Sequence, residues 1–106
     1  PGPRAGWLVP NALDRLCRTA YTVTTESNRI GLRLDGSPIG WAREGELESE
    51  GMVLGAVQVP PDGRPVVFLA DHPPTGGYPV VAVVRADDLW QCAQLRPGDE
   101  VRFVHG

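Results

Sequence analysis

The chain has 106 residues, 42% of them hydrophobic, and this length suits a single domain, spanning 1–106, that buries roughly two-thirds of its unfolded surface. The formal charge of −3 gives no electrostatic reason to expect nucleic acid or an anionic membrane as a partner. No apolar run approaches the roughly 20 residues that span a bilayer, so we expect a cytoplasmic protein.

The ten basic residues are all arginine, which excludes a biotinylated lysine, a Schiff base and a Walker lysine within this chain. Cys17 and Cys92 are the only cysteines, and each lies among apolar neighbours in a predicted helix. We therefore expect both thiols to be free and buried. His72 and His105 have no second ligand at metal spacing, so no metal site is predicted.

Glycine and proline punctuate short apolar runs along the chain, a pattern that favours many short strands. Near the N-terminus, Asn11 is placed to cap a short helix. Residues on one face of that helix would be Leu13, Leu16, Cys17 and Ala20. The β-branched and aromatic run 21–25 predicts a strand. Residues 29–35 then alternate between apolar and polar, which predicts a half-buried strand with Ile30, Leu32 and Leu34 on one side.

Residues 36–51 form a polar, acidic segment around Trp41 that the pattern does not assign. Its alternating glutamates are Glu44, Glu46, Glu48 and Glu50. One of these glutamates could act as a general base, but the sequence pattern does not indicate which carboxylate. Catalytic residues therefore stay unassigned.

The second half of the chain predicts a hairpin, two further strands and a helix. Val57 and Val59 alternate, a turn follows at 61–63, and the apolar run 66–70 returns. The apolar run 80–84 predicts a strand covered on both faces and central in the sheet. A helix starts near Asp87, with Leu89, Cys92 and Ala93 inside, and the last strand is 101–104. About six strands and two short helices result, most economically as a closed or nearly closed barrel.

Three segments in this order identify a resemblance: SNRIGLRL at 27–34, GAVQVPPDGRP at 55–65 and TGGYP at 75–79. The opening PGPRAGW, the LADHP before TGGYP and the closing QLRPGDEVRF fit the same pattern. Together they resemble the second half of proteins of the allophanate hydrolase subunit 2 family. This family is also known as the biotin-dependent carboxyltransferase-like family. The family is also called carboxyltransferase subdomain A and B, and it includes the C subunit of 5-oxoprolinase. The resemblance covers nearly the whole chain.

The resemblance implies a cyclophilin-like β-barrel that forms the C-terminal lobe of a larger subunit. Its implied partners are the N-terminal lobe of that subunit, missing here, and an allophanate hydrolase subunit 1-like protein. The leading implied activity is hydrolysis of 5-oxoproline to glutamate with ATP. One alternative is carboxyl transfer to a urea-like acceptor from carboxybiotin, with biotin carried on another domain. Another is a non-enzymatic regulatory module that antagonises a kinase inhibitor. Fold transfers more safely than reaction.

In the first segment, Arg29 and Arg33 would project from one face about 13 Å apart, at about 3.3 Å per residue. Gly31 between them would leave an open notch for a small anion, which guanidinium groups bind bidentately. Asn28 would add an amide contact. The plain alternative is a solvated strand face whose arginines pair with the glutamates of the next segment.

In the second and third segments the candidate substrate-binding residues are Gln58, Thr75, Gly76, Gly77 and Tyr78. Gln58 carries both a donor and an acceptor for a urea-like or lactam amide, and its plain alternative is an exposed strand glutamine. The two glycines let the backbone approach a ligand, while Tyr78 supplies a flat wall or a phenol hydrogen bond. The plain alternative is a tight turn with Tyr78 on the core.

The chain departs from the family pattern just before TGGYP. Relatives usually carry arginine and glutamine where His72 and Pro73 stand, and threonine at Pro74. This chain therefore lacks the arginine, glutamine and threonine side chains that relatives carry at these three positions.

Overall fold

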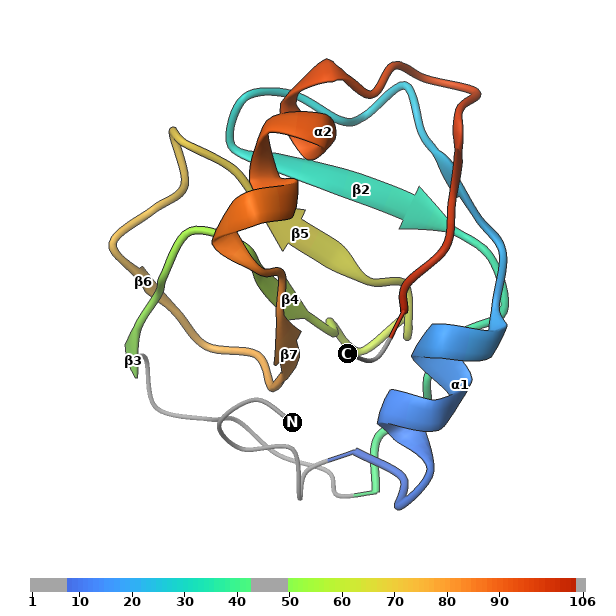
Figure 1. Ribbon diagram of the computed structural model, residues 1–106. Helices are drawn as coiled ribbons and strands as arrows, with labels where there is room; N and C mark the ends of the chain where they lie inside the picture. Colours follow the sequence, from blue (N-terminus) through green and yellow to red (C-terminus); the bar gives the residue numbers. More distant parts are fainter. Residues whose placement is uncertain (1–7, 43–49, 105–106) are drawn as a thin grey trace.

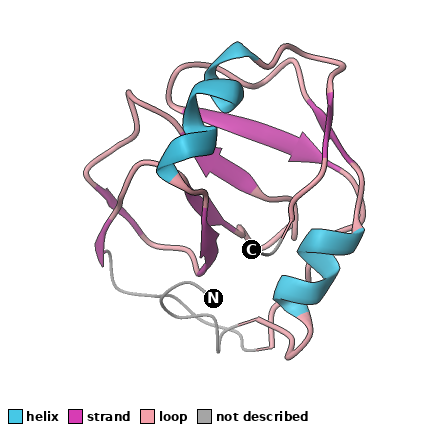
Figure 2. Cartoon of the chain, viewed as in Figure 1, coloured by secondary structure: helices cyan, strands magenta, loops and turns pink. Residues whose placement is uncertain are grey.

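The structure of the protein is a computed structural model that describes residues 8–42 and 50–104 (Figure 1). It is mainly β, with a six-stranded sheet in the order β7-β4-β5-β2-β1-β8 and a two-stranded ribbon formed by β3 and β6 (Figure 2). All strand pairs are antiparallel. The predicted fold class of about six strands and two short helices is confirmed, and the ribbon is an addition.

The elements, in chain order, are α1 (Ala12–Arg18), β1 (Tyr21–Val23), β2 (Gly31–Asp35), β3 (Glu50–Gly51), β4 (Ala56–Gln58), β5 (Val66–Phe68), β6 (Thr75–Gly76), β7 (Val80–Val83), α2 (Leu89–Gln94) and β8 (Glu100–Val101). A 3-10 turn, Ala86–Asp88, leads into α2. No helix in these described ranges is long and apolar enough to cross a membrane.

Helix α1 begins where the sequence predicted, but its first turn lacks a side-chain cap. Asn11 occupies the N-cap position, and its side chain makes no capping hydrogen bond. Leu16 is buried, whereas Ala20 lies beyond the end of the helix and is exposed. The prediction that Ala20 belongs to the inward face of the helix was therefore wrong, because the helix ends at Arg18.

The hairpin of β4 and β5 is confirmed, with Val57 opposite Val67. Its turn needs Gly63, which has a φ of 80°. A Cβ at this position would lie 2.7 Å from the Cβ of Pro38 and 2.8 Å from the carbonyl oxygen of Ile39. The glycine therefore serves both the left-handed backbone and the close approach of the preceding loop.

Strand β2 shows the alternation that the sequence predicted, over a shorter range. Leu32 and Leu34 are buried while Arg33 is exposed. Ile30 lies outside the strand and is 46% exposed, so its predicted place on the apolar side was wrong. The strand starts at Gly31 because the preceding residues form a turn closed by Asn28.

Strand β7 is an edge strand, and the prediction that it would be central was wrong. Its neighbour in the sheet is β4, and it ends the strand order opposite β8. Val80 and Val81 belong to two different apolar clusters on opposite faces of the sheet, whereas Val83 is 47% exposed. The continuous apolar run at 80–84 thus arises because side chains pack on both faces of the strand. It does not indicate that β7 has a neighbouring strand on each side.

The sheet curves round without closing, because no strand pairing joins β7 to β8 in the part of the chain that the structure describes. Strand β8 ends at Val101, three residues before the predicted end. In α2, Leu89 and Cys92 are half-buried while Ala93, predicted to face inward, is exposed. Both cysteines are free and half-buried, so they are less buried than predicted.

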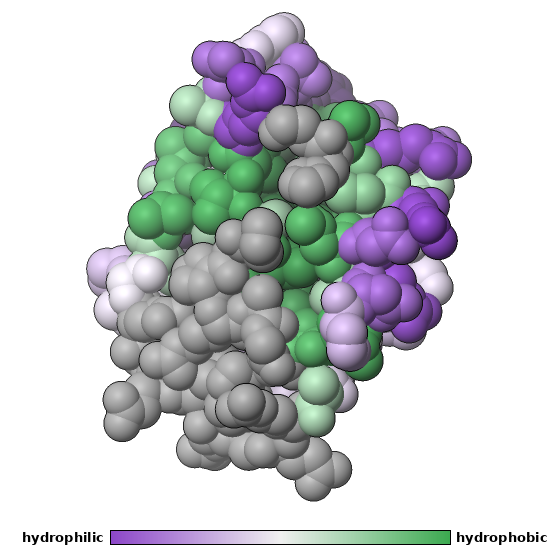
Figure 3. All heavy atoms as spheres, turned by 60° about the horizontal axis from the view of Figure 1, so that its bottom comes forward, coloured by the Kyte–Doolittle hydropathy of each residue, from purple (hydrophilic) through white to green (hydrophobic). Residues whose placement is uncertain are grey.

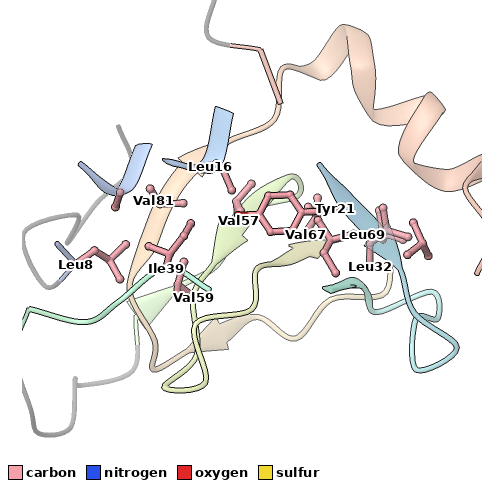
Figure 4. Close-up of a cluster of buried hydrophobic side chains, with 13 residues drawn as sticks. Leu8, Leu16, Tyr21, Leu32, Ile39, Val57, Val59, Val67, Leu69 and Val81 are labelled. Atoms are coloured by element: carbon pink, nitrogen blue, oxygen red, sulfur yellow. The ribbon is translucent and has the colours of Figure 1, made fainter. Parts of the chain in front are cut away.

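The main core lies on what we call the inner face of the sheet (Figure 4). It takes side chains from helix α1, from five strands (β1, β2, β4, β5 and β7) and from the loop before Trp41. Its fully buried members include Leu16, Tyr21, Leu34, Ile39, Val57, Val67 and Val81. A smaller cluster occupies the opposite, outer face and consists of Met52, Ala56, Val66, Phe68 and Val80.

Candidate functional site

A row of side chains crosses four strands on the outer face of the sheet. Arg33 on β2 is opposite Val66 on β5, Val66 is opposite Gln58 on β4, and Gln58 is opposite Val80 on β7. Directly opposite residues of antiparallel strands point to the same face. Arg33 and Gln58 therefore share this cross-strand row, about 10 Å apart at twice the spacing of neighbouring strands.

Gln58 is the buried polar member of the row. It is only 6% exposed and stands among the apolar residues of the outer face. No hydrogen bond joins its side-chain amide to another described residue, and the amide atoms keep some contact with solvent, since the fully buried polar atoms without a partner are Tyr21 Oη and Thr24 Oγ1. A ligand amide could take the place of that solvent and hydrogen-bond to Gln58. The plain alternative of an exposed strand glutamine is wrong.

The ribbon of β3 and β6 covers Gln58 and brings the predicted TGGYP segment to it. Met52 donates its backbone N–H to the carbonyl oxygen of Pro74 over 2.9 Å, next to the pairing of Gly51 with Thr75. A Cβ at Gly76 would lie 2.7 Å from Met52 Cε and 3.0 Å from Gln58 Nε2. Glycine at this position therefore lets the ribbon lie directly against the amide.

An aromatic pair stands next to this amide. The indole Nε1–H of Trp41 donates to the carbonyl oxygen of Val59, the residue after Gln58, over 3.0 Å. The Trp41 and Tyr78 rings have centroids 6.1 Å apart and are inclined at 60°. Tyr78 is 43% exposed, so the alternative in which it packs into the core is wrong.

The contacts on Val59 hold these groups at one end of β4. Its N–H donates to the carbonyl oxygen of Pro79 over 2.8 Å, which fixes Tyr78 one residue away. Trp41 was not among the predicted site residues. Its signal was weak, because it belongs to the acidic segment that the sequence pattern left unassigned.

The arginine pair predicted from the first segment separates in the structure. Arg33 joins the cross-strand row, whereas Arg29 lies in the turn before β2 and accepts the N–H of Asp71 at its carbonyl oxygen. The open notch predicted at Gly31 is wrong. Gly31 is buried, and a Cβ there would lie 2.9 Å from Val66 Cγ1.

Asn28 has a structural task that the sequence reasoning did not assign. Its Oδ1 accepts the backbone N–H of Ile30 at 2.9 Å and that of Gly31 at 3.3 Å. These hydrogen bonds close the turn that starts β2. The side-chain oxygen of Asn28 is thus committed to the turn.

The ion-pair alternative for the arginines involves glutamates at 44–48 that lie outside the described residues. Among those described, neither Arg29 nor Arg33 takes part in an ion pair. The guanidinium of Arg33 is exposed on the face that carries Gln58. This arrangement leaves its charge available to an anion.

The divergent residues before TGGYP have local contacts. The His72 ring lies near Phe68 of the outer cluster, with ring centroids 6.1 Å apart, and its Nδ1 is 2.7 Å from the carbonyl oxygen of Pro73. Pro74 contributes its carbonyl oxygen to Met52. No group of histidine, cysteine and carboxylate side chains suited to a metal occurs in the described ranges.

The fold and this site define a class: a mainly β fold whose outer face carries a largely buried glutamine, an arginine without an ion pair among the described residues, and an aromatic pair. The chain belongs to the family described as "Carboxyltransferase domain, subdomain A and B", whose model matches residues 1–105.

Three relatives are much longer than this chain. It is 36% identical to the C subunit of 5-oxoprolinase from Escherichia coli K12 over 98% of this chain and 34% of that protein. For the same subunit from Haemophilus influenzae the identity is 38% over 81% of this chain and 28% of that protein. The crystal structure of Kluyveromyces lactis urea carboxylase matches with a TM-score of 0.87 and 30% identity, over 98% of this chain and 10% of that one. The chain thus spans about a third or less of the length of these relatives.

Proposed function

We propose that residues 1–106 form the C-terminal lobe of a 5-oxoprolinase-type subunit and contribute a substrate-binding wall. In this proposal the complete assembly hydrolyses 5-oxoproline to glutamate with ATP. The N-terminal lobe of the subunit and an allophanate hydrolase subunit 1-like protein supply the rest of the site. The two relatives that are named as 5-oxoprolinase subunits support this choice of reaction. We also propose a cytoplasmic location, which suits the two free cysteines.

The observation that carries the proposal is that Gln58, only 6% exposed and without a side-chain hydrogen bond to a described residue, shares a row with Arg33, whose guanidinium forms no ion pair with a described residue. 5-Oxoproline presents a lactam amide and a carboxylate. The lactam can donate and accept at the Gln58 amide, and the carboxylate can accept from Arg33. The Tyr78 ring, inclined on Trp41, offers a flat surface to the five-membered ring.

An unactivated lactam resists hydrolysis, and ATP turnover would supply the driving force for opening it. The chain contains no lysine for a phosphate loop, so ATP would bind on another part of the assembly. Within this lobe, Arg33 would stabilise negative charge that develops on the bound substrate. Gln58 would hold the amide in a fixed orientation.

The test is release of ADP that depends on 5-oxoproline, measured on the full-length subunit with its partners. We expect Gln58→Leu to lower catalytic efficiency for 5-oxoproline at least about tenfold, or roughly 1.4 kcal/mol. The matched control is Gln94→Leu, the same change at an exposed glutamine of α2, which should keep normal turnover. Equal activity of the two variants would remove Gln58 from the site.

A second candidate function is carboxyl transfer from carboxybiotin to a urea-like acceptor. The similarity to K. lactis urea carboxylase favours it. Gln58 would then orient the acceptor amide, while Arg33 would hold the carboxylate that is transferred. Biotin would arrive on another domain, because this chain has no lysine to carry it.

The same assay separates the two reactions. Bicarbonate-dependent carboxylation of urea with a biotin-bearing partner, in the absence of turnover with 5-oxoproline, would replace the first proposal by the second. Absence of both activities in a correctly assembled complex would favour the non-enzymatic regulatory module.

A further inference from the structure

A groove of about 620 Å³ runs between the two ends of the open sheet, and its lining is mainly apolar but includes Arg85, Asp88, Gln91, Glu100 and Arg102. Residues from four regions line it: Leu16 on α1, Ala82 and Val83 on β7, Cys92 on α2, and Phe103 after β8. Val83 is 47% exposed and Val104, at the same groove, is 89% exposed. Figure 3 shows hydrophobic residues gathered on the described part of the face that comes forward from the bottom of Figure 1, with polar residues above them and to their right.

Among the described residues, no strand pairs with the outer edge of β7, which forms one wall of the groove. The N–H of Val84 donates to the carbonyl oxygen of Gly55 over 2.8 Å, and Ala82 is opposite Val57. Alternate residues of an antiparallel strand point their N–H and C=O groups in opposite directions. Val83 therefore points its backbone groups away from β4, toward the groove.

An open strand edge beside an apolar hollow is suited to binding an extended segment by strand addition. Main-chain hydrogen bonds to Val83 would align such a segment. Its alternate apolar side chains would fill the groove. Exposed apolar surface of this kind marks interaction sites in folded proteins.

We propose that the groove binds an extended apolar segment of the other lobe of the same subunit, which adds to the free edge of β7. This inference rests on one part of the proposed function, namely that the chain is one lobe of a longer subunit. Two observations favour this occupant over others. The matched region is only 34% of the E. coli subunit, and the family is described by two subdomains.

A second copy of the chain suits the groove less well. Pairing of two copies about a two-fold axis brings the same patch of each copy together. Two facing hollows would leave their lining side chains without contacts, because a hollow needs a protruding partner. The occupant must therefore present a ridge of apolar side chains that the groove itself does not contain.

The first experiment mixes this 106-residue chain with the remainder of the subunit, produced as a separate polypeptide. We expect a one-to-one complex in which the amide hydrogen of Val83 exchanges at least about tenfold more slowly than in the chain alone. Val83→Pro removes that N–H, which β4 does not use, and should weaken the complex about tenfold or more. The matched control, Val83→Thr, keeps the N–H and the branched shape, and should retain binding.

A complex that leaves Val83 exchanging as fast as before would overturn the inference, as would a concentration-dependent dimer of the chain that protects Val83. If the two pieces fail to associate, hydrogen exchange is measured on the full-length subunit instead. Fast exchange of the Val83 amide in that subunit would contradict the proposal. Neither measurement uses substrate. Protection of Val83 in a subunit without 5-oxoproline turnover would therefore refute the proposed reaction and keep this interface.

Discussion

The two faces of the sheet differ in what they bury. The inner face is filled by apolar side chains from the helix and several strands, and Tyr21 is its largest member. The outer face carries a smaller apolar cluster, in which the amide of Gln58 is buried and the guanidinium of Arg33 lies at the border. A polar group kept in an apolar cluster without a protein partner is costly for folding. The inner face thus holds the larger core, and the outer face carries the polar side chains on which the proposed function rests.

Neighbouring residues of β2 show the contrast most directly. Leu34 points to the inner face and is 1% exposed, while Arg33 points to the outer face and is exposed. Because successive strand residues alternate between faces, changes at these two positions test the two faces separately.

The largest expected effect is on the inner face. Leu34→Ala should lower the free energy of unfolding by about 2–5 kcal/mol, because it removes buried methyl groups and leaves a cavity. Chemical denaturation of the 106-residue chain measures this change. A loss below about 0.5 kcal/mol would show that the inner face is not the main core.

Arg33→Ala on the outer face should act on function. In the complete assembly it should lower catalytic efficiency at least about tenfold, roughly 1.4 kcal/mol, because a charge-assisted contact to the substrate is lost. Its unfolding free energy should change by no more than about 0.5 kcal/mol, since the side chain is exposed and forms no ion pair with described residues. Steady-state kinetics and thermal melting distinguish the outcomes. A normal rate would make Arg33 a surface residue, and a large drop in Tm would make it structural.

Gln58→Leu sharpens the comparison through stability. Leucine removes a buried amide that lacks a partner among the described residues, so the unfolding free energy should stay unchanged or rise by about 1 kcal/mol. Urea unfolding of the chain, with Leu34→Ala as the destabilised reference, measures the effect. Destabilisation by more than about 1 kcal/mol would indicate that the amide has a structural partner.

The smallest effect concerns Cys92, which packs at the margin of the inner core. Burial raises the pKa of its thiol, and the nearby Asp88 carboxylate raises it further. Because the thiolate is the reactive form, labelling of Cys92 in a Cys17→Ser variant should increase only at higher pH than for a free thiol. The folded chain holds this proton more tightly than the unfolded chain, so the stability contributed is complete below the pKa of the unfolded thiol and is lost as the pH rises. Asp88→Asn should move the labelling curve to lower pH, and an unmoved curve would argue against the carboxylate.

Several features were predictable because they depend on residues close together in the sequence. The turn at 61–63 and its flanking strands follow from local backbone preferences, and the alternation in β2 follows from the two-residue period of a strand. The three ordered segments also identified the family that the comparisons show. The same kind of local reasoning was only partly right for Asn11. This residue lies at the predicted N-cap position of the helix, but its side chain makes no capping hydrogen bond.

The candidate site depended on contacts between distant segments. Sequence alone placed Gln58 between its valine neighbours, but only the ribbon of β3 and β6, folded back over the outer face, determines that its amide is buried beside Gly76. The same holds for Trp41, whose indole donates to the carbonyl oxygen of Val59 and whose ring packs against that of Tyr78. Strand order likewise made β7 an edge. Sequence by itself determined the strand period, the turn and the family, because these are local or cumulative signals, whereas burial and edge position were decided by the tertiary structure, because they depend on which distant segment covers each face.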